Sequence, residues 1–295
     1  MGYLSFPTLL SRPLFKSGTI GTGKYKIKRI VYNGEFIDRI TLADGAGKRI
    51  DYRFYRTSAD ILTAFKLGEI NEIDDLTSIQ DLPKWKEIEI IPKLRQDRYV
   101  AVFFNNNDEN LSEKSFRQAL TYAIPNKPND EKRSLSPISS DSWAYNPQVK
   151  PYITDVNLAR EIIKSLYPDR ELPKLELTTT TPYLARAEEI ANAWNQIGIE
   201  TKVKVIPVVS GNFQVLIIGQ QIPSDPDQYL FWHSTQPANI THYASPKVDK
   251  LLEDGRKTLD KNKRKEIYRD FQRFLLEDCP AAFLEHVTTY TIRRK

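Results

Sequence analysis

Residues 175–208 alternate strand-like and helix-like patterns, and they constrain the fold more than any other part of the chain. The ends of this segment, 175–180 and 201–208, are rich in branched and hydroxyl-bearing residues, which favour strands. Between them, apolar residues recur at the spacing of one helix face, and Gly198 follows as a stop signal. These apolar residues are Leu184, Ala187, Ile190, Ala191, Trp194 and Ile197. Strand, helix and strand in succession predict a parallel pair with a right-handed crossover, so we expect an α/β fold.

The other elements follow from the same kinds of signal. Strand patterns occur at 25–31, 36–42, 50–55, 70–73, 87–92, 99–104 and 283–292. Helix patterns begin near Ser58, at Ser112, after Thr154 or Asp155, after Ser245, and at Lys261. The pair Asp44-Gly45 predicts a hairpin turn, and Gly68 is expected just past the end of the first helix. The mixture of strands and helices predicts mixed sheets flanked by helices.

Length and charge narrow the class of protein. At 295 residues the chain exceeds what one core usually organises, so we expect two lobes. No apolar run is long enough to cross a bilayer, and no signal peptide is visible. The net charge is +5, but the basic residues are interleaved with 38 acids and lack neighbouring aromatics, so we expect no nucleic-acid partner. The single cysteine, Cys279, lies among apolar neighbours and predicts a buried structural thiol.

The stretch 213–232 joins an apolar run to a polar, turn-rich segment. Residues 215–218, closed by Gly219, predict a strand buried on both faces. Gln220 and Gln221 are expected in the loop that follows, because residues 222–226 are typical of a turn. A rigid strand that delivers amides into a loop is a common way to build a binding site. An ordinary strand followed by an ordinary loop is the alternative.

A second feature is the long segment 125–151, which contains five prolines and the aromatic pair Trp143 and Tyr145. A loop of this length in a compact domain is usually functional or disordered. Its two aromatic residues favour a segment that packs on something.

Several separate motifs, in this order, resemble one known family. They are Gly21-Thr22-Gly23 with Tyr25, the helix end at 62–70, Asn105 with the block at 116–124, Asp225-Pro226, Asn239, Tyr243, 248–252, and Glu277-Asp278 with Pro280. As an ordered set they resemble the extracellular solute-binding proteins of family 5, the oligopeptide-, dipeptide- and nickel-binding components of ABC importers. Departures include Lys24 where the family has proline and Asn71 where aspartate is usual.

The resemblance implies a periplasmic-binding-protein-like fold of type II with two lobes, the larger of them incomplete. Residues 1–97 would belong to the larger lobe, to which 271–295 would return, and 98–270 would form the smaller one. It further implies an extracytoplasmic, lipoprotein-type location, a peptide or small-molecule ligand held in a cleft between the lobes, and ABC transporter permease subunits as partners. We expect a monomer without a cofactor.

The resemblance also assigns a candidate site. The ligand-binding candidates are Tyr99, Gly219, Gln220, Gln221, Ile222 and Trp232. In peptide-binding relatives an aspartate just before the Asp-Pro pair holds the ligand's ammonium group, and Ile222 occupies that position here. An isoleucine cannot pair with a cation, whereas Gln220 and Gln221 offer amide donors and acceptors. We therefore expect a ligand that need not be an ordinary peptide.

Other functions remain open at this point. A hydrolase would use Asp225 or Asp227 as its base, although an Asp before a proline usually bonds nearby backbone. A nickel-type site would use His233 or His242, but the histidines lack metal-motif spacing, so we expect no metal site and no catalytic residue. A non-catalytic interaction module, or a fragment that binds no ligand, is the main alternative to solute capture.

Overall fold

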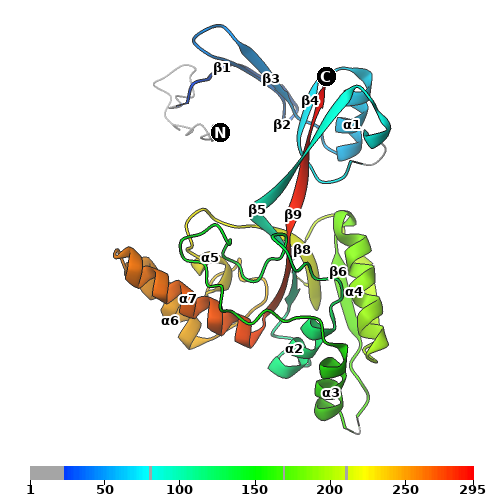
Figure 1. Ribbon diagram of the computed structural model, residues 1–295, viewed down its shortest axis with the longest axis vertical. Helices are drawn as coiled ribbons and strands as arrows, with labels where there is room; N and C mark the ends of the chain where they lie inside the picture. The colour runs from blue at the N-terminus through cyan, green and yellow to red at the C-terminus, as the bar shows by residue number, and fades with distance from the viewer. Residues whose placement is uncertain (1–22, 80–81, 169, 210–211) are drawn as a thin grey trace. The chain divides into compact units, whose positions relative to one another are not determined.

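The computed structural model describes residues 23–79, 82–168, 170–209 and 212–295, which form two compact units (Figure 1). Unit 1 comprises the described residues up to Pro92 together with 290–295, and unit 2 comprises 93–289. The predicted lobes were divided at 97/98 and 270/271, and that assignment stays a prediction. Residues 21–22 of the Gly-Thr-Gly motif lie outside the described residues.

Unit 1 contains a three-stranded antiparallel sheet in the order β1-β2-β3, formed by β1 (Lys26–Asn33), β2 (Phe36–Ala43) and β3 (Arg49–Arg53). The predicted hairpin turn at Asp44 is confirmed, because Ala43 pairs with Arg49 across it. The Asp44 carboxylate accepts hydrogen bonds from the backbone N–H groups of Ala46 and Lys48 at 3.0 and 2.9 Å. The turn is therefore stabilised by its own aspartate.

The rest of unit 1 is a helix packed on strands. Helix α1 (Ser58–Leu67) is capped by Thr57 and ends at Gly68, whose φ of 79° suits glycine, as predicted. Strand β4 (Glu72–Leu76) begins two residues later than predicted and pairs with the end of β9 (Ala281–Arg294). A short 3-10 helix, η1 (Leu82–Lys84), follows. Seven buried residues form the core of this part: Leu62, Phe65, Ile73, Leu76, Leu82, Ile88 and Ile292.

Strand β5 (Ile88–Phe104) corrects one prediction. The sequence predicted two strands, 87–92 and 99–104, whereas the structure has one continuous strand. Residues 93–98 between them, most of which are polar, remain extended, and 94–98 are half-buried. The prediction missed this part of the strand because it relied on the pattern of apolar residues, and polar residues in an extended strand do not give that pattern.

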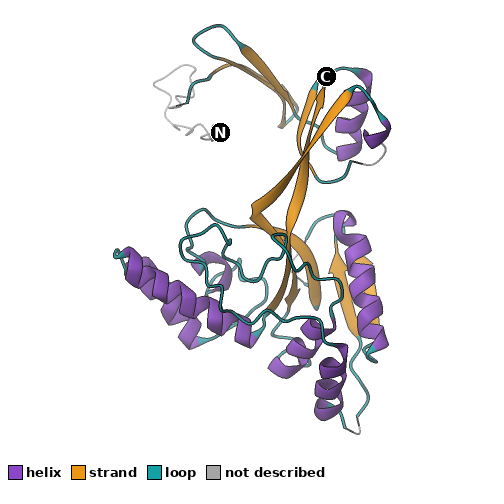
Figure 2. Cartoon of the chain, viewed as in Figure 1, coloured by secondary structure: helices purple, strands orange, loops and turns teal. Residues whose placement is uncertain are grey.

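Unit 2 is a layered α/β structure (Figure 2). Its sheet runs in the order β9-β5-β8-β6-β7, with β6 (Leu175–Thr179), β7 (Thr201–Val205) and β8 (Val215–Gln221). The predicted parallel pairing of β6 with β7 is confirmed, and β8 is parallel to β6 but antiparallel to β5. Strand β7 ends at Val205 rather than at 208.

Helices cover the sheet of unit 2. They are α2 (Lys114–Ala123), α3 (Val156–Leu166), α4 (Leu184–Gln196), α5 (Tyr229–Trp232), α6 (Pro246–Lys257) and α7 (Lys261–Asp278), with the 3-10 turn η2 (Thr181–Tyr183) before α4. The predicted caps Asp155 and Ser245 accept hydrogen bonds from their first turns. Helix α2 begins later than predicted, because Glu113 rather than Ser112 caps it. The short helix α5 was not predicted.

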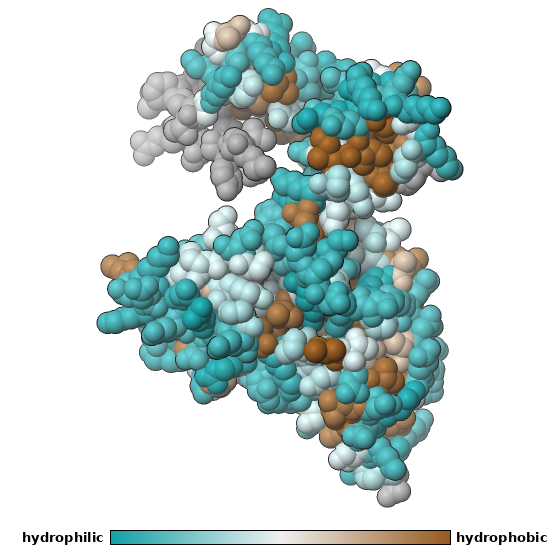
Figure 3. Space-filling view, viewed as in Figure 1, coloured by the Kyte–Doolittle hydropathy of each residue, from teal (hydrophilic) through white to brown (hydrophobic). Residues whose placement is uncertain are grey.

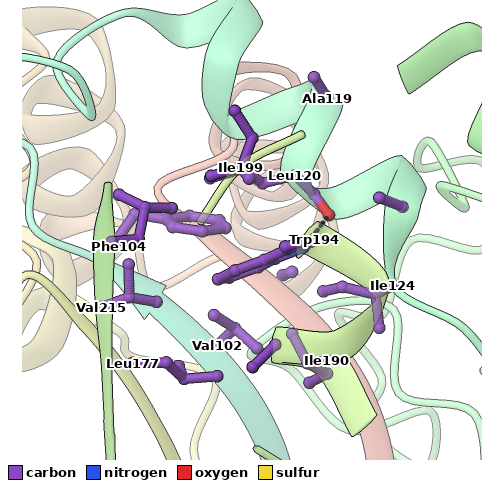
Figure 4. Close-up of a cluster of buried hydrophobic side chains, with 14 of the residues drawn as sticks. Val102, Phe104, Ala119, Leu120, Ile124, Leu177, Ile190, Trp194, Ile199 and Val215 are labelled. Carbon is purple, nitrogen blue, oxygen red and sulfur yellow. Dashed lines mark hydrogen bonds between the residues drawn. The ribbon is translucent and has the colours of Figure 1, made fainter. Parts of the chain in front are cut away.

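Two hydrophobic cores lie on the two faces of this sheet. One contains Trp194, whose indole N–H donates to the Leu120 carbonyl at 2.9 Å, packed among residues of α2, α4 and the strands (Figure 4). The other joins the sheet to α5, α6 and α7, with Tyr268 and Phe271 fully buried. Alternate residues of β8 enter the two cores: Val215 and Ile217 one, Leu216 the other. The prediction that 215–218 are buried on both faces is confirmed for 215–217, whereas Ile218 is only half-buried.

Candidate functional site

Strand β8 extends further than predicted. The sequence predicted that Gln220 and Gln221 lie in a loop, but both belong to the strand. They pair with Tyr99 and Arg98 of β5 in the antiparallel ladder. The next N–H group, that of Ile222, donates to the Asp97 carbonyl at 2.8 Å. The ladder therefore extends through both glutamines because β5 continues alongside them.

Gly219 lies where no side chain fits. A Cβ atom at this position would collide with the hydroxyl group of Tyr183 and would lie 3.7 Å from the Tyr99 carbonyl oxygen. Burial raises the pKa of Tyr183, and the nearby Gly219 backbone and Arg98 act in the opposite direction. The glycine is thus explained by the close approach of Tyr183 to the strand.

Tyr99 and Gln220 are joined side chain to side chain. The Tyr99 hydroxyl donates to Gln220 Oε1 at 3.1 Å. Tyr99 is 1% exposed, and burial raises its pKa above the usual range, so the phenol stays protonated. Its ring meets Phe283 edge to face at 5.1 Å. The hydrogen bond orients the Gln220 amide near the end of β8.

Ile222 and Trp232 contribute their side chains to the core of unit 2. Ile222 is 6% exposed and Trp232 is 1% exposed. The Trp232 ring stacks on Phe103 with centroids 6.4 Å apart, and its indole nitrogen is buried without a hydrogen-bond partner among the described residues. The ligand-binding role of the six candidates stays a prediction. The structure gathers Tyr99 and residues 219–222 at one strand end, with Trp232 in the core on one face.

The two aspartates considered as catalytic bases are both paired with arginines. Asp225 accepts a bidentate pair from Arg264 at 2.6 and 2.9 Å, and Asp227 accepts from Arg256 at 2.8 Å. The hydrogen bond from Arg264 lowers the pKa of Asp225. A carboxylate held ionised by arginine is a weak proton acceptor, so this arrangement fastens the loop after β8 to α6 and α7.

The candidate metal-binding histidines are dispersed. His233 stacks on Tyr229 with centroids 4.2 Å apart, and its Nε2 lies 3.7 Å from Glu253. His242 lies in a loop with a φ of 52°. Across the described residues, no group of three or more His, Cys, Asp or Glu side chains is placed to hold a metal ion.

A cavity of about 670 Å³ in unit 2 was missed by the sequence analysis. It lies against the long segment between α2 and α3, the green trace of Figure 1, and Gln96, Lys127, Arg133 and Tyr145 line part of it. Burial is the main cause that lowers the pKa of Lys127 to about 7 and that of Arg133 to about 10. The only sequence signal was the unusual length of this segment, together with Tyr145.

Among the helices of the described residues, none is long and apolar enough to cross a bilayer. On the face shown in Figure 3, hydrophilic residues cover most of unit 2, and apolar residues occur there in small separate groups.

The fold defines the class of protein. The chain resembles the solute-binding protein CtaP of Listeria monocytogenes with a TM-score of 0.80 at 22% identity, over 94% of this chain and 62% of that one. It also resembles NikZ of Campylobacter jejuni, solved with Ni(L-His), with a TM-score of 0.76 at 22% identity, over 93% of this chain and 63% of that one. The fold is that of a type II periplasmic binding protein.

The sequence identifies the family. A profile described as "Bacterial extracellular solute-binding proteins, family 5 Middle" matches residues 11–242, and the chain belongs to this family. The dipeptide-binding protein of Escherichia coli K12 is 23% identical in an alignment of 345 positions, which covers 99% of this chain and 63% of that protein. The chain spans less than two thirds of the length of this relative.

Proposed function

We propose that this chain is the solute-binding component of an ABC importer, which captures a peptide or another small polar solute and delivers it to the membrane transporter. The relatives named for dipeptide binding support this proposal. The observation that carries it is the end of β8, where a strand buried on both faces presents Gln220 and Gln221 at the limit of the ladder. A rigid strand end with convergent polar groups suits the recognition of a small ligand.

The chemistry of this strand end favours a ligand recognised by hydrogen bonds. Ile222 supplies no charge and its side chain is buried. The amide of Gln220 is oriented by Tyr99, and Gln221 is exposed at the last position of the strand. Such amides both donate and accept, so they bind neutral polar groups such as peptide units. Because residue 222 is an isoleucine, we do not propose that a carboxylate at this position holds an ammonium group of the ligand.

The same proposal makes the chain a binding protein rather than an enzyme, acting outside the cytoplasm. Asp225 and Asp227 are fastened by arginines, which supports a structural role for them. Two of the relatives are named as oligopeptide- and dipeptide-binding proteins, and the family is described as extracellular.

The test is calorimetric titration of the complete natural protein with di- to pentapeptides, together with thermal unfolding in the presence of each. A bound ligand raises the melting temperature, because it stabilises only the folded state. Tyr99→Phe removes the hydroxyl that orients Gln220 and should weaken binding by roughly two- to tenfold. Tyr243→Phe also removes a tyrosine hydroxyl, one that donates to Asp278, and serves as the matched control.

Peptide affinity unchanged by Tyr99→Phe would contradict the assignment of this strand end. No ligand from peptide, sugar and nickel panels would favour the interaction module instead. Tight binding that depends on a free peptide ammonium group would contradict the proposed ligand chemistry.

A further inference from the structure

Two cationic side chains, Lys127 and Arg133, line the cavity beside residues 125–154, and both donate hydrogen bonds to backbone carbonyls. Lys127 Nζ donates to the Thr121 and Tyr152 carbonyl oxygens, both at 2.6 Å. Arg133 Nη1 donates to the carbonyl oxygens of residues 134, 283 and 284 at 2.5–2.6 Å, and its Nη2 to that of Pro151 at 2.9 Å. These bonds hold the two ends of the segment together.

Both cations retain unused donors, and neither has a carboxylate partner among the described residues. An ammonium has three N–H donors and a guanidinium has five, which exceeds the two acceptors of Lys127 and the four of Arg133 among the described residues. Within the described parts of the chain, no carboxylate forms an ion pair with Lys127 or Arg133, and Glu285 is the acid that acts on Arg133 at longer range. A half-buried cation without a counter-charge is poorly stabilised, and an anion from solution would supply that charge.

The other residues that line the cavity suit an organic anion better than a small inorganic anion. Leu135, Pro151 and Ile153 supply apolar surface, and Gln96 and Asn126 supply amides. The volume of about 670 Å³ lies within the range of small-molecule sites. Asp130 and Glu131 also line the cavity, so a ligand with several negative charges is disfavoured.

We propose that this cavity is a binding site for a small monocarboxylate, whose carboxylate contacts Lys127 and Arg133 while its apolar or amide-bearing body lies against Leu135 and Ile153. The site lies wholly in unit 2 and differs from the strand end of β8. It does not depend on the proposed transport function. Free N-acyl amino acids and the C-termini of short peptides share this chemistry.

The first experiment titrates the protein with N-acetylleucine and with its uncharged analogue, N-acetylleucine amide, at low ionic strength. The carboxylate should bind at least tenfold more tightly, because only it forms charge-assisted hydrogen bonds with the two cations. An N-acetylated tetrapeptide ending in leucine distinguishes a peptide C-terminus from a free amino acid derivative. Equal affinity for the acid and the amide, or binding of neither, would overturn the proposal.

The second experiment changes the charge at the cavity without touching the bonds that hold the segment. Ile153 lines the cavity but is 74% exposed, so substitutions there should leave folding intact. Ile153→Glu should weaken N-acetylleucine binding by roughly two- to fivefold and Ile153→Lys should strengthen it similarly, with Ile153→Gln as the neutral control. The same affinity for all three variants would place the ligand elsewhere.

The third experiment measures the affinity for N-acetylleucine as a function of pH. Burial and the neighbouring cations Arg133 and Arg186 lower the pKa of Lys127, Cys279 acts in the opposite direction, and Asp130 and Glu131 share the cavity. Carboxylate affinity should therefore fall between pH 6 and 8.5, as Lys127 loses its proton. Lys127→Arg keeps the charge and should bind with a flatter pH profile. Identical profiles for the two proteins would show that Lys127 does not contact the ligand.

Discussion

The sheet of unit 2 and the three-stranded sheet of unit 1 differ in how much of each is buried. In β8, Val215, Leu216 and Ile217 are fully buried, because helices cover both faces of the sheet. In unit 1, Tyr32 and Phe36 are each 61% exposed, and β1 has no buried residue. The candidate strand end and the cavity therefore both belong to the unit whose sheet has a hydrophobic core on each face.

The contrast also has an energetic side. Burial of apolar area is the main favourable term in folding, at about 25 cal/mol per Å². Unit 2 has two cores, whereas the three-stranded sheet buries mainly Leu42 and Ala43. We therefore expect substitutions in unit 2 to cost more than substitutions on the exposed sheet.

The largest effect is expected from Trp194→Ala. Trp194 is fully buried, and its N–H bonds to the Leu120 carbonyl, so truncation leaves both a cavity and an unpaired carbonyl (Figure 4). We expect a loss of about 3–5 kcal/mol in unfolding free energy, measured by urea denaturation. Trp194→Phe keeps most of the ring and should cost less. A loss below about 1 kcal/mol for the alanine variant would contradict the contrast between the two sheets.

The next effect concerns the strand end itself. Gly219→Ala places a methyl group against the Tyr183 hydroxyl, and overpacking of this kind costs about 1–3 kcal/mol. The double variant Gly219→Ala, Tyr183→Phe removes the hydroxyl and should recover part of the loss. Thermal unfolding of the single and double variants measures the coupling. If the second substitution gave no recovery, Tyr183 would not be the obstacle.

Much of the fold could be predicted from local signals. Helix α7 begins and ends where the sequence predicted, and α4 carries its predicted apolar face, because caps and periodicity act within a few residues. The burial of 215–217 was predicted for the same reason. The extension of β8 through Gln221 was not, since it depends on Arg98 and Tyr99 of a strand about 120 residues earlier.

The contacts of the candidate site likewise could not be predicted from local sequence patterns. The sequence singled out residues 219–222, but it could not show that the Tyr99 hydroxyl bonds to Gln220 or that Tyr183 lies over Gly219. The cavity could not be predicted from the sequence either, because it depends on contacts between distant residues. Arg133 is held by carbonyls of residues 283 and 284, about 150 positions away, and no local pattern announces such contacts. Local patterns determine elements, whereas sites depend on which elements meet.

A smaller effect is expected at the cap of α1 in unit 1. The Thr57 hydroxyl accepts from the Asp60 N–H at 3.1 Å and donates to its carboxylate at 2.8 Å. Thr57→Ala should cost about 1 kcal/mol, and Thr57→Ser should retain most of the stability. Amide hydrogen exchange resolves the effect, because protection should fall in α1 and remain unchanged in β8. Equal loss of protection in both elements would indicate that the two units unfold together.

The smallest effect is expected on the exposed sheet. Tyr32 pairs with Ile37 in the β1–β2 ladder but is 61% exposed, so Tyr32→Thr removes little buried area while keeping strand propensity. The unfolding free energy should change by no more than about 0.5 kcal/mol. Leu42→Thr in the same sheet is the matched control, because Leu42 is 7% exposed and its replacement should cost about 1–3 kcal/mol. If Tyr32→Thr cost as much as Leu42→Thr, the face of the sheet that carries Tyr32 would be buried in solution. The difference in burial between this sheet and that of unit 2 would then not hold.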